Sequence, residues 1–342
     1  MKIRKCLSYD DVLLAPQYSD IKSRSEVLIG SALDDGRLFD LPIVSSPMDT
    51  LTESSMAAAM NTAGGLGIIH RYNSIEDQVA IAMAVELADV QTVAAAIGIS
   101  GDYFERATEL AKAGVGIFCL DVAHGHHIMM RDAIENIRRN YPGIHVIAGN
   151  VATREAFEDL ANWGAHSIRV GIGGGSICST RIQTGHGVPA LQSIMDCAGA
   201  DVKTDVRIIA DGGIRNSGDI VKALAAGADF VMLGSLLAGT SQTPGTVMTG
   251  MGGKKYKSYR GMASKEAQHD WRGRHSSNEG ISTTVPFRGD VKEILADLSN
   301  GIRSGFSYSG ARNIYELHLR SHFVMQTHAG QIESNTHILG KK

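Results

Sequence analysis

Eight short apolar runs recur along the chain, and segments with helical periodicity lie between them. The runs are continuous rather than alternating, which is typical of strands buried on both faces under helices. Eight strand-then-helix units favour a closed α/β barrel, the (β/α)8 or TIM barrel, over an open sheet. The predicted strands are 41–46, 65–70, 92–97, 116–121, 145–150, 167–171, 207–211 and 230–234. The predicted helices include 54–63, 75–87, 103–113, 128–140, 154–163 and 217–226.

The length of 342 residues suits one such barrel. A prior of about 150 residues per domain suggests two domains, but barrels often reach about 250 residues or more as one. We therefore expect a single catalytic domain over 1–342. Two segments interrupt the barrel rhythm: a glycine- and hydroxyl-rich loop at 171–187 and a polar, glycine-rich flap at 240–286. Long irregular segments in a compact domain are usually lids or binding loops.

Charge and cysteine content exclude several classes of function. The 33 basic and 36 acidic residues are scattered, so we expect no nucleic-acid partner. The apolar runs are far shorter than the roughly 20 residues of a membrane span, and the N-terminus has no apolar signal core, so we expect a cytoplasmic protein without membrane contact. The four cysteines form no CxxC pair, which argues against a disulfide framework and against zinc.

In such a barrel the active site lies at the carboxyl ends of the strands. Glycine is frequent, 39 of 342 residues, against a typical share of about 7%. The glycines of 171–175 suit a phosphate or a monovalent cation held by carbonyls, with a plain barrel turn as the alternative. Asp211-Gly212-Gly213 and Gly234-Ser235 end the strands beside which barrels commonly bind phosphate. The sequence therefore predicts a phosphorylated ligand.

Cys178 is the candidate nucleophile. It lies on the glycine-rich loop beside Ser179 and Thr180, a polar setting that favours thiolate and nucleophilic attack. Cys119 falls in a predicted strand and Cys197 in a helical segment, where a cysteine is ordinarily a small buried apolar residue.

Taken together, these residues resemble the inosine monophosphate dehydrogenase and guanosine monophosphate reductase family over nearly the whole chain. The order and spacing of the motifs make a chance match improbable. They are YDDVLLAP at 9–16, SSPMDT at 45–50, GNVAT at 149–153, the Cys178 loop, ADGGI at 210–214, YRGM at 259–262 and EG at 279–280.

The resemblance implies a homotetramer of (β/α)8 barrels in which Cys178 attacks C2 of a purine mononucleotide and hydride passes between C2 and a nicotinamide. It implies that the substrate phosphate is held by Ser176, Gly213, Gly234, Ser235 and Tyr259. The ribose would be held by Asp211, and the base by Met262 and Glu279. Further substrate contacts would come from Ser46, Met48, Gly212 and Gly261. It implies cofactor contacts from Asp121, Ala123, Asn150 and Gly171, and a potassium ion on the carbonyls of Gly173, Gly175 and Cys178.

Two features favour the reductase, which releases ammonia from GMP and forms IMP with NADPH. The family's dehydrogenases hydrolyse the adduct with an Arg-Tyr dipeptide on the flap, and the only such pair here, Arg71-Tyr72, follows the second strand instead. They also usually carry an inserted regulatory domain, whereas only 86–91 separate the second helix from the third strand. In this interpretation Thr180 and Glu279 relay a proton to the departing amine.

Two alternatives remain. The sequence of 208–215 is closer to that of the dehydrogenases, and Arg272 or Arg274 could activate water. An IMP dehydrogenase that forms XMP with NAD is therefore the first alternative. A non-catalytic purine-nucleotide scaffold is a second alternative, although a pure binder has no need of Cys178, Thr180 and Glu279. The chain lacks the dinucleotide fingerprint that would separate NADP from NAD.

Overall fold

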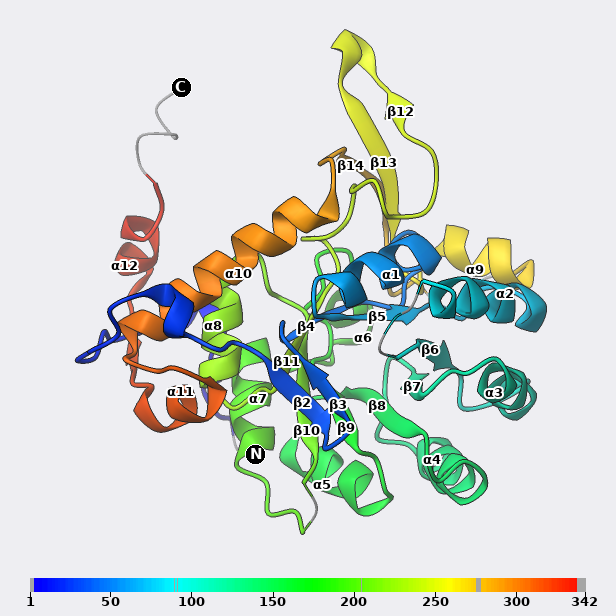
Figure 1. Cartoon of the computed structure of the whole chain (residues 1–342), viewed down its shortest axis with the longest axis horizontal. Helices are drawn as coiled ribbons and strands as arrows, with labels where there is room; N and C mark the ends of the chain where they lie inside the picture. The colour runs from blue at the N-terminus through cyan, green and yellow to red at the C-terminus, as the bar shows by residue number, and fades with distance from the viewer. Residues whose placement is uncertain (1–2, 89, 91, 204, 275–277, 337–342) are drawn as a thin grey trace.

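The computed structural model describes residues 3–88, 90, 92–203, 205–274 and 278–336. Eight parallel strands close into a barrel in the order β10-β11-β4-β5-β6-β7-β8-β9 (Figure 1). The predicted fold class is confirmed, and each predicted strand agrees with the observed one to within two residues at either end. The barrel strands are β4 (Ile43–Ser45), β5 (Leu66–Ile69), β6 (Ala94–Ile97), β7 (Ile117–Asp121), β8 (His145–Val151), β9 (Ser167–Val170), β10 (Arg207–Asp211) and β11 (Phe230–Leu233).

The six predicted helices are also confirmed, with ends within one residue. Several begin at a polar cap: the side chain of Ser74 accepts from the Asp77 amide, that of Thr153 from Ala156 and that of Asn216 from Asp219. The helices are α1 (Ser54–Thr62), α2 (Ile75–Glu86), α3 (Tyr103–Lys112), α4 (Ile128–Asn140), α5 (Arg154–Asn162), α6 (Thr180–Thr184), α7 (Ala190–Ala198), α8 (Ser217–Ala225), α9 (Lys265–Arg272), α10 (Val291–Tyr308), α11 (Ile314–Arg320) and α12 (His328–Glu333).

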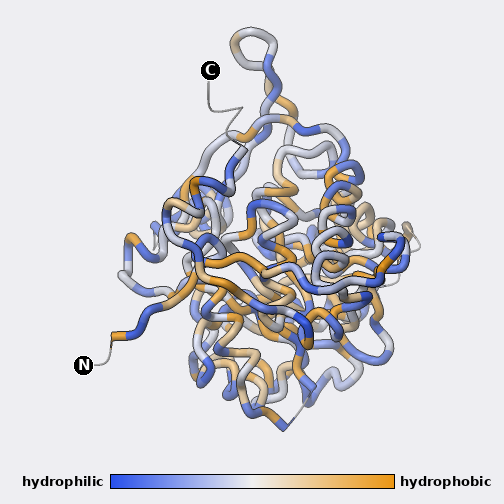
Figure 2. The backbone as a smooth tube through the Cα atoms, turned by 90° about the vertical axis from the view of Figure 1, so that its left-hand side faces the viewer, coloured by the Kyte–Doolittle hydropathy of each residue, from blue (hydrophilic) through white to orange (hydrophobic). Residues whose placement is uncertain are grey.

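A hairpin of β2 (Ser31–Asp34) and β3 (Arg37–Phe39) packs against the barrel interior. The ring of Phe39 meets that of Phe230 edge-on at a centroid distance of 5.8 Å, and Asp34 bonds to His145 at the start of β8. Because parallel strands all begin at the same end of a barrel, this hairpin lies at the end opposite the expected site. The barrel strands consist mostly of apolar, buried residues, which colour the tube orange in Figure 2.

The flap at 240–286 is more ordered than the sequence indicates. It contains the antiparallel strands β12 (Met248–Thr249), β13 (Lys255–Arg260) and β14 (Ser282–Pro286), as well as α9. The β12–β13 hairpin projects away from the barrel (Figure 1). Lys257 in β13 is buried, and its ammonium donates to the carbonyls of Thr240 and Thr243. Flap residues 275–277, and residues 89 and 91 before β6, lie outside the described residues.

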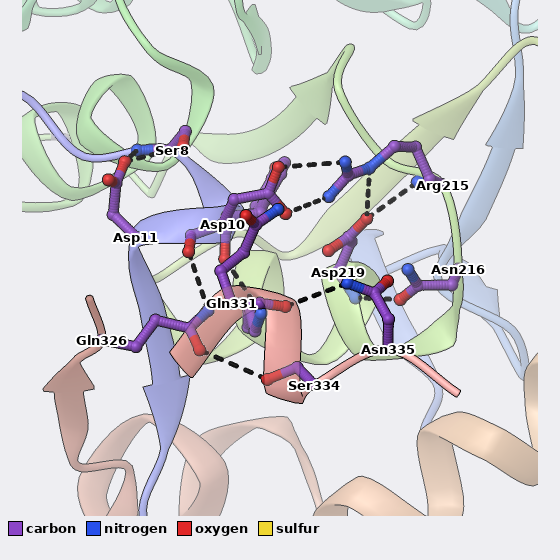
Figure 3. A network of polar contacts seen from close by, with 12 residues as sticks. Ser8, Asp10, Asp11, Arg215, Asn216, Asp219, Gln326, Gln331, Ser334 and Asn335 are labelled. Atoms are coloured by element: carbon purple, nitrogen blue, oxygen red, sulfur yellow. Dashed lines mark hydrogen bonds and ion pairs between the residues drawn. The ribbon is translucent and has the colours of Figure 1, made fainter. Parts of the chain in front are cut away.

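Segments from both ends of the chain meet beside the barrel. Strand β1 (Val12–Leu14) pairs antiparallel with β15 (Phe323–Met325). The short helix η1 (Tyr9–Asp11) carries Asp10, which holds the guanidinium of Arg215 through both carboxylate oxygens, while Asp219 bonds to its Nε. Figure 3 shows this network, with Gln326 and Ser334 of the C-terminal segment beside it. The network anchors the loop that follows β10, and Arg215 itself lines the main cavity.

Candidate active site

One cavity of about 400 Å³ opens at the carboxyl ends of the barrel strands. Every residue that the family resemblance assigns to substrate, cofactor, cation or the reductase relay lines it. Arg272 and Arg274, the candidate water-activating groups of the dehydrogenase, are not among its lining residues in the described chain. The set comprises Ser46, Met48, Asp121, Ala123, Asn150, Gly171, Gly173, Gly175, Ser176, Cys178, Thr180, Asp211, Gly212, Gly213, Gly234, Ser235, Tyr259, Gly261, Met262 and Glu279. The barrel thus gathers residues from the ends of six strands and from the flap around a space of the size that small molecules occupy.

Cys178, Thr180 and Glu279 form a hydrogen-bonded line. The Cys178 thiol donates to Thr180 Oγ1 at 3.2 Å, and the Thr180 hydroxyl donates to Glu279 Oε2 at 2.8 Å. Backbone pairing fixes this arrangement, because the Ser179 amide donates to the Glu279 carbonyl and the Ile281 amide to the Ile177 carbonyl. A proton can therefore pass between the neighbourhood of the sulfur and a carboxylate through one hydroxyl.

A row of charged side chains, centred on a buried arginine, crosses the floor of the cavity. Arg169 in β9 bonds to Asp121 at 2.5 Å and to Asp211 at 2.9 Å. Asn150 Nδ2 donates to the same Asp211 oxygen at 2.8 Å and to the Gly171 carbonyl at 2.7 Å. Arg169 is only 6% exposed. The proposed ribose acceptor, Asp211, is therefore held in place by two donors before any ligand is considered.

Sequence reasoning missed Arg169, although a signal was present. An arginine within an otherwise apolar strand is costly to bury and is retained where it is paired. Arg71 and Tyr72, which follow β5, also line the cavity. The sequence placed this Arg-Tyr pair away from the flap, yet the Tyr72 ring stacks on Trp271 of α9 at 4.1 Å. The pair and the flap are neighbours in space.

At two places around the cavity, glycines permit close approach of backbone segments. A Cβ on Gly234 would lie 2.7 Å from the Tyr259 hydroxyl, and one on Gly171 would lie 1.9 Å from the Asp211 carbonyl. Burial raises the pKa of Tyr259 to about 12, although a hydrogen bond from Ser176 acts in the other direction. Tyr259 is thus a neutral hydrogen-bond donor at ordinary pH. The Ser46 hydroxyl is already engaged, since it donates to the Leu233 carbonyl.

The carbonyls proposed for potassium lie on one loop. The Gly175 carbonyl accepts the Cys178 amide, while those of Gly173 and Cys178 accept no hydrogen bond from the described residues. Arg181 braces the loop by donating to the carbonyls of Ile172 and Val188. Backbone carbonyls are the ligands that suit potassium, so this loop fits such an ion. Within the described ranges, no group of three His, Cys, Asp or Glu side chains is placed to hold a metal.

A closed (β/α)8 barrel with a cavity at the carboxyl ends of its strands is the architecture of the barrel enzymes. The comparisons with known proteins are more specific. The family model described as the IMP dehydrogenase / GMP reductase domain matches residues 6–337, and the chain belongs to this family. Members of the family are oxidoreductases that act on purine nucleotides with a nicotinamide dinucleotide, and the chain shares this class.

Two sequence relatives are both inosine-5'-monophosphate dehydrogenases. That of Nitrosopumilus maritimus (strain SCM1) is 33% identical over 472 residues, which cover 98% of this chain and 99% of the relative. That of Cryptosporidium parvum is 37% identical over 387 residues, which cover 98% and 96%. The second alignment exceeds the length of this chain only modestly, so a protein with this name need not carry a large insert. The short connection before β6 therefore does not separate the two activities.

A solved structure is similar over almost its entire length. It is the crystal structure of a GMP reductase from Trypanosoma brucei, with one cysteine replaced by alanine, in complex with guanosine 5'-monophosphate. The TM-score is 0.92 and the sequence identity 30%, over 98% of both chains. Among the residues that the structure describes, no helix is both long and apolar enough to cross a bilayer.

Proposed function

We propose that this protein is a GMP reductase, which converts GMP and NADPH to IMP, ammonia and NADP. The observation that carries the proposal is the line from Cys178 through Thr180 to Glu279. It supplies what deamination at a purine carbon needs: a nucleophile, and an acid for the departing amine. The similar barrel from Trypanosoma brucei, which is a GMP reductase with guanosine 5'-monophosphate bound, supports the same choice.

In the proposed reaction, the Cys178 thiolate attacks C2 of GMP, and a carbon–sulfur bond forms. The thiol proton passes through the Thr180 hydroxyl to Glu279, and the carbon–nitrogen bond breaks as Glu279 returns this proton along the same line, so the amine leaves as ammonia. Reduced nicotinamide, when bound, supplies a hydride to C2. The sulfur then departs as thiolate with the bonding electrons, which leaves IMP. Two protons from solvent complete the balance: one restores the Cys178 thiol, and the other converts ammonia to ammonium.

Residues at the ends of β7 and β8 fit a nicotinamide. Asn150 Oδ1 is buried and has no hydrogen-bond partner in the described part of the chain. An unpaired acceptor in a binding cavity is costly unless a ligand supplies a donor. A carboxamide offers such a donor, and Asn150 and Asp121 would hold it. We propose NADPH as the cofactor and potassium, on the carbonyls of Gly173, Gly175 and Cys178, as the cation.

IMP dehydrogenase is the second candidate. Both sequence relatives described above are named as dehydrogenases, and the Arg71-Tyr72 pair borders the flap helix. An arginine beside the cavity is a candidate for activating the water that this reaction requires. The separation of Arg71 from the Cys178 line by the width of the barrel favours the reductase, because β5 and β9 are not neighbours in the strand order.

The deciding experiment follows the absorbance of reduced nicotinamide with each substrate pair. Consumption of NADPH with GMP is the expected result. Formation of NADH from NAD with IMP would replace the proposal with the dehydrogenase. Nucleotide binding without either reaction would establish the scaffold alternative. The same preparation tests the homotetramer that we also propose, by light scattering; exposed apolar residues in the flap hairpin, including Met248 and Met251, are consistent with contact between copies.

A further inference from the structure

An arginine and a tryptophan of the flap helix form a platform at the rim of the cavity. The Tyr72 and Trp271 rings are stacked, with 4.1 Å between centroids and 16° between planes. The guanidinium carbon of Arg272 lies 3.9 Å from the centroid of the Trp271 ring. Tyr72 lines the cavity, so this stack connects Arg272 to the cavity wall. An arginine that rests on an indole is held in place and keeps its outer N–H groups available.

The positive charge at this rim is only partly paired. Arg71 lies 5.3 Å from the Trp271 ring, and its only acidic neighbour in the described residues is Asp121, 3.8 Å from its Nε. Asp121 is already bonded to Arg169. Arg272 is exposed and has no acidic partner among the described residues. The contrast is Arg260 on the same flap, whose guanidinium is paired with both Asp49 and Asp270.

The platform lies where a dinucleotide has to leave the cavity. The residues proposed for phosphate binding follow β9, β10 and β11, whereas Asp121 and Asn150 belong to β7 and β8. Tyr72 follows β5, which lies beyond β6 on the side of the barrel away from β9. A cavity of about 400 Å³ cannot enclose a mononucleotide and a whole dinucleotide together. The phosphates and the second nucleoside of the cofactor must therefore pass over the rim.

We propose that Arg272, supported by Trp271, binds a phosphate of the dinucleotide cofactor. This inference rests on the proposed function only in that the protein uses a nicotinamide dinucleotide, and it holds for either direction of hydride transfer. The planar guanidinium forms paired hydrogen bonds with phosphate oxygens, which a lysine ammonium cannot reproduce. NADPH offers two such groups, the diphosphate and the monoester on the ribose, and both have the chemistry that Arg272 would recognise.

The test measures binding rather than turnover. Calorimetry gives the Kd of NADPH and of NADH for the full chain carrying Cys178→Ala, with GMP present to fill the nucleotide side. Adding Arg272→Gln should raise the Kd of NADPH about tenfold or more, the usual effect of losing a charged hydrogen bond. Arg272→Lys should recover part of the loss. The matched control is Lys265→Gln, which removes one charge from the first turn of the same helix.

The outcomes distinguish the two phosphate groups of the cofactor from each other and from the absence of a contact. A loss confined to NADPH assigns Arg272 to the ribose phosphate, and an equal loss for NADPH and NADH assigns it to the diphosphate. The Kd should also depend less on salt in Arg272→Gln than in its parent, because an ion pair with the ligand has been removed. Kd values for both dinucleotides within about twofold of those of the Lys265→Gln control overturn the inference. Failure of the unsubstituted protein to reduce GMP would instead overturn only the proposed function.

Discussion

The Thr180 hydroxyl and the Glu279 carboxylate, 99 positions apart in the sequence, meet at 2.8 Å. One belongs to the loop after β9 and the other to the end of the flap, and an isolated bridge between Cys178 and Gly280 locks these two segments together. The reacting sulfur and its proton source are therefore positioned by the same backbone pairing.

Replacing Glu279 with Gln should slow reduction of GMP about a hundredfold or more, because the amide cannot supply the proton that general acid catalysis requires. Binding of GMP should change little. Steady-state rates and calorimetry check both statements. Glu266→Gln serves as the control, since Glu266 lies on the exposed surface of the flap and its carboxylate accepts a hydrogen bond from Ser282, away from the cavity. A Glu279→Gln protein with an undiminished rate would remove Glu279 from the proposed relay.

Alkylation should distinguish the cysteines. Burial raises the pKa of Cys119 to about 11 and that of Cys197 to about 12, so both stay protonated and inaccessible near neutral pH. Cys178 lines the cavity and should react with iodoacetamide, and GMP should protect it. Peptide mass spectrometry measures the modification of each residue. Faster labelling of Cys119 than of Cys178 would contradict the assignment of the nucleophile.

Cys178→Ala should abolish turnover and leave nucleotide binding largely intact, because the variant lacks the sulfur that forms the covalent bond. Intact-protein mass spectrometry of the unsubstituted enzyme, quenched with acid during turnover, should detect a nucleotide adduct that the variant never forms. Retained turnover in Cys178→Ala would refute the covalent role.

Arg169→Met should lower stability by about 3 kcal/mol or more, because it leaves two carboxylates in the barrel floor without their shared cation. Chemical denaturation measures the change in unfolding free energy. Arg131→Met is the comparison, since the exposed pair of Arg131 and Asp132 should contribute about 1 kcal/mol at most. Equal effects of the two substitutions would show that the buried charges are not coupled as the geometry indicates.

Stability should fall as the pH drops from about 6.5 toward 4. Burial lowers the pKa of His145 to about 4, and burial together with the adjacent His145 lowers that of His166 to about 4. The unfolded chain therefore binds these protons at a higher pH than the folded one, and protonation favours unfolding within this window. Thermal unfolding at a series of pH values measures the slope. His145→Gln should reduce it; an unchanged slope would exclude His145 as its source.

Gly171→Ala should disrupt the site through the backbone. Its φ of 145° is unfavourable for alanine, and the new Cβ would lie 1.9 Å from the Asp211 carbonyl oxygen. We expect a loss of about 3 kcal/mol or more in stability. Gly143→Ala is the control, because no heavy atom lies within 4 Å of the Cβ position there. Normal stability combined with weakened cofactor binding would show instead that Gly171 acts through the ligand.

The sequence by itself determined the barrel. Continuous apolar runs with helices between them can bury both strand faces in very few ways, so the strands and helices at 41–234 could be predicted closely from local patterns. The same reasoning located the carboxyl ends of the strands, where Cys178, Asp211 and Gly234 are found. The strands of the flap could not be predicted in this way, because β13 and β14 gain stability from pairing with each other rather than from local periodicity.

Only the tertiary structure decided which charged and aromatic side chains meet. Arg169 is 48 positions from Asp121, and Arg71 and Tyr72 lie far from Trp271 in the sequence. The barrel closure and the folding back of the flap bring them together, and no local pattern encodes such distances. Hydrophobic periodicity is a property of neighbouring residues, whereas a salt bridge or a ring stack depends on how distant segments cross. The barrel could thus be predicted from the sequence, whereas the contacts between the side chains of its site could not.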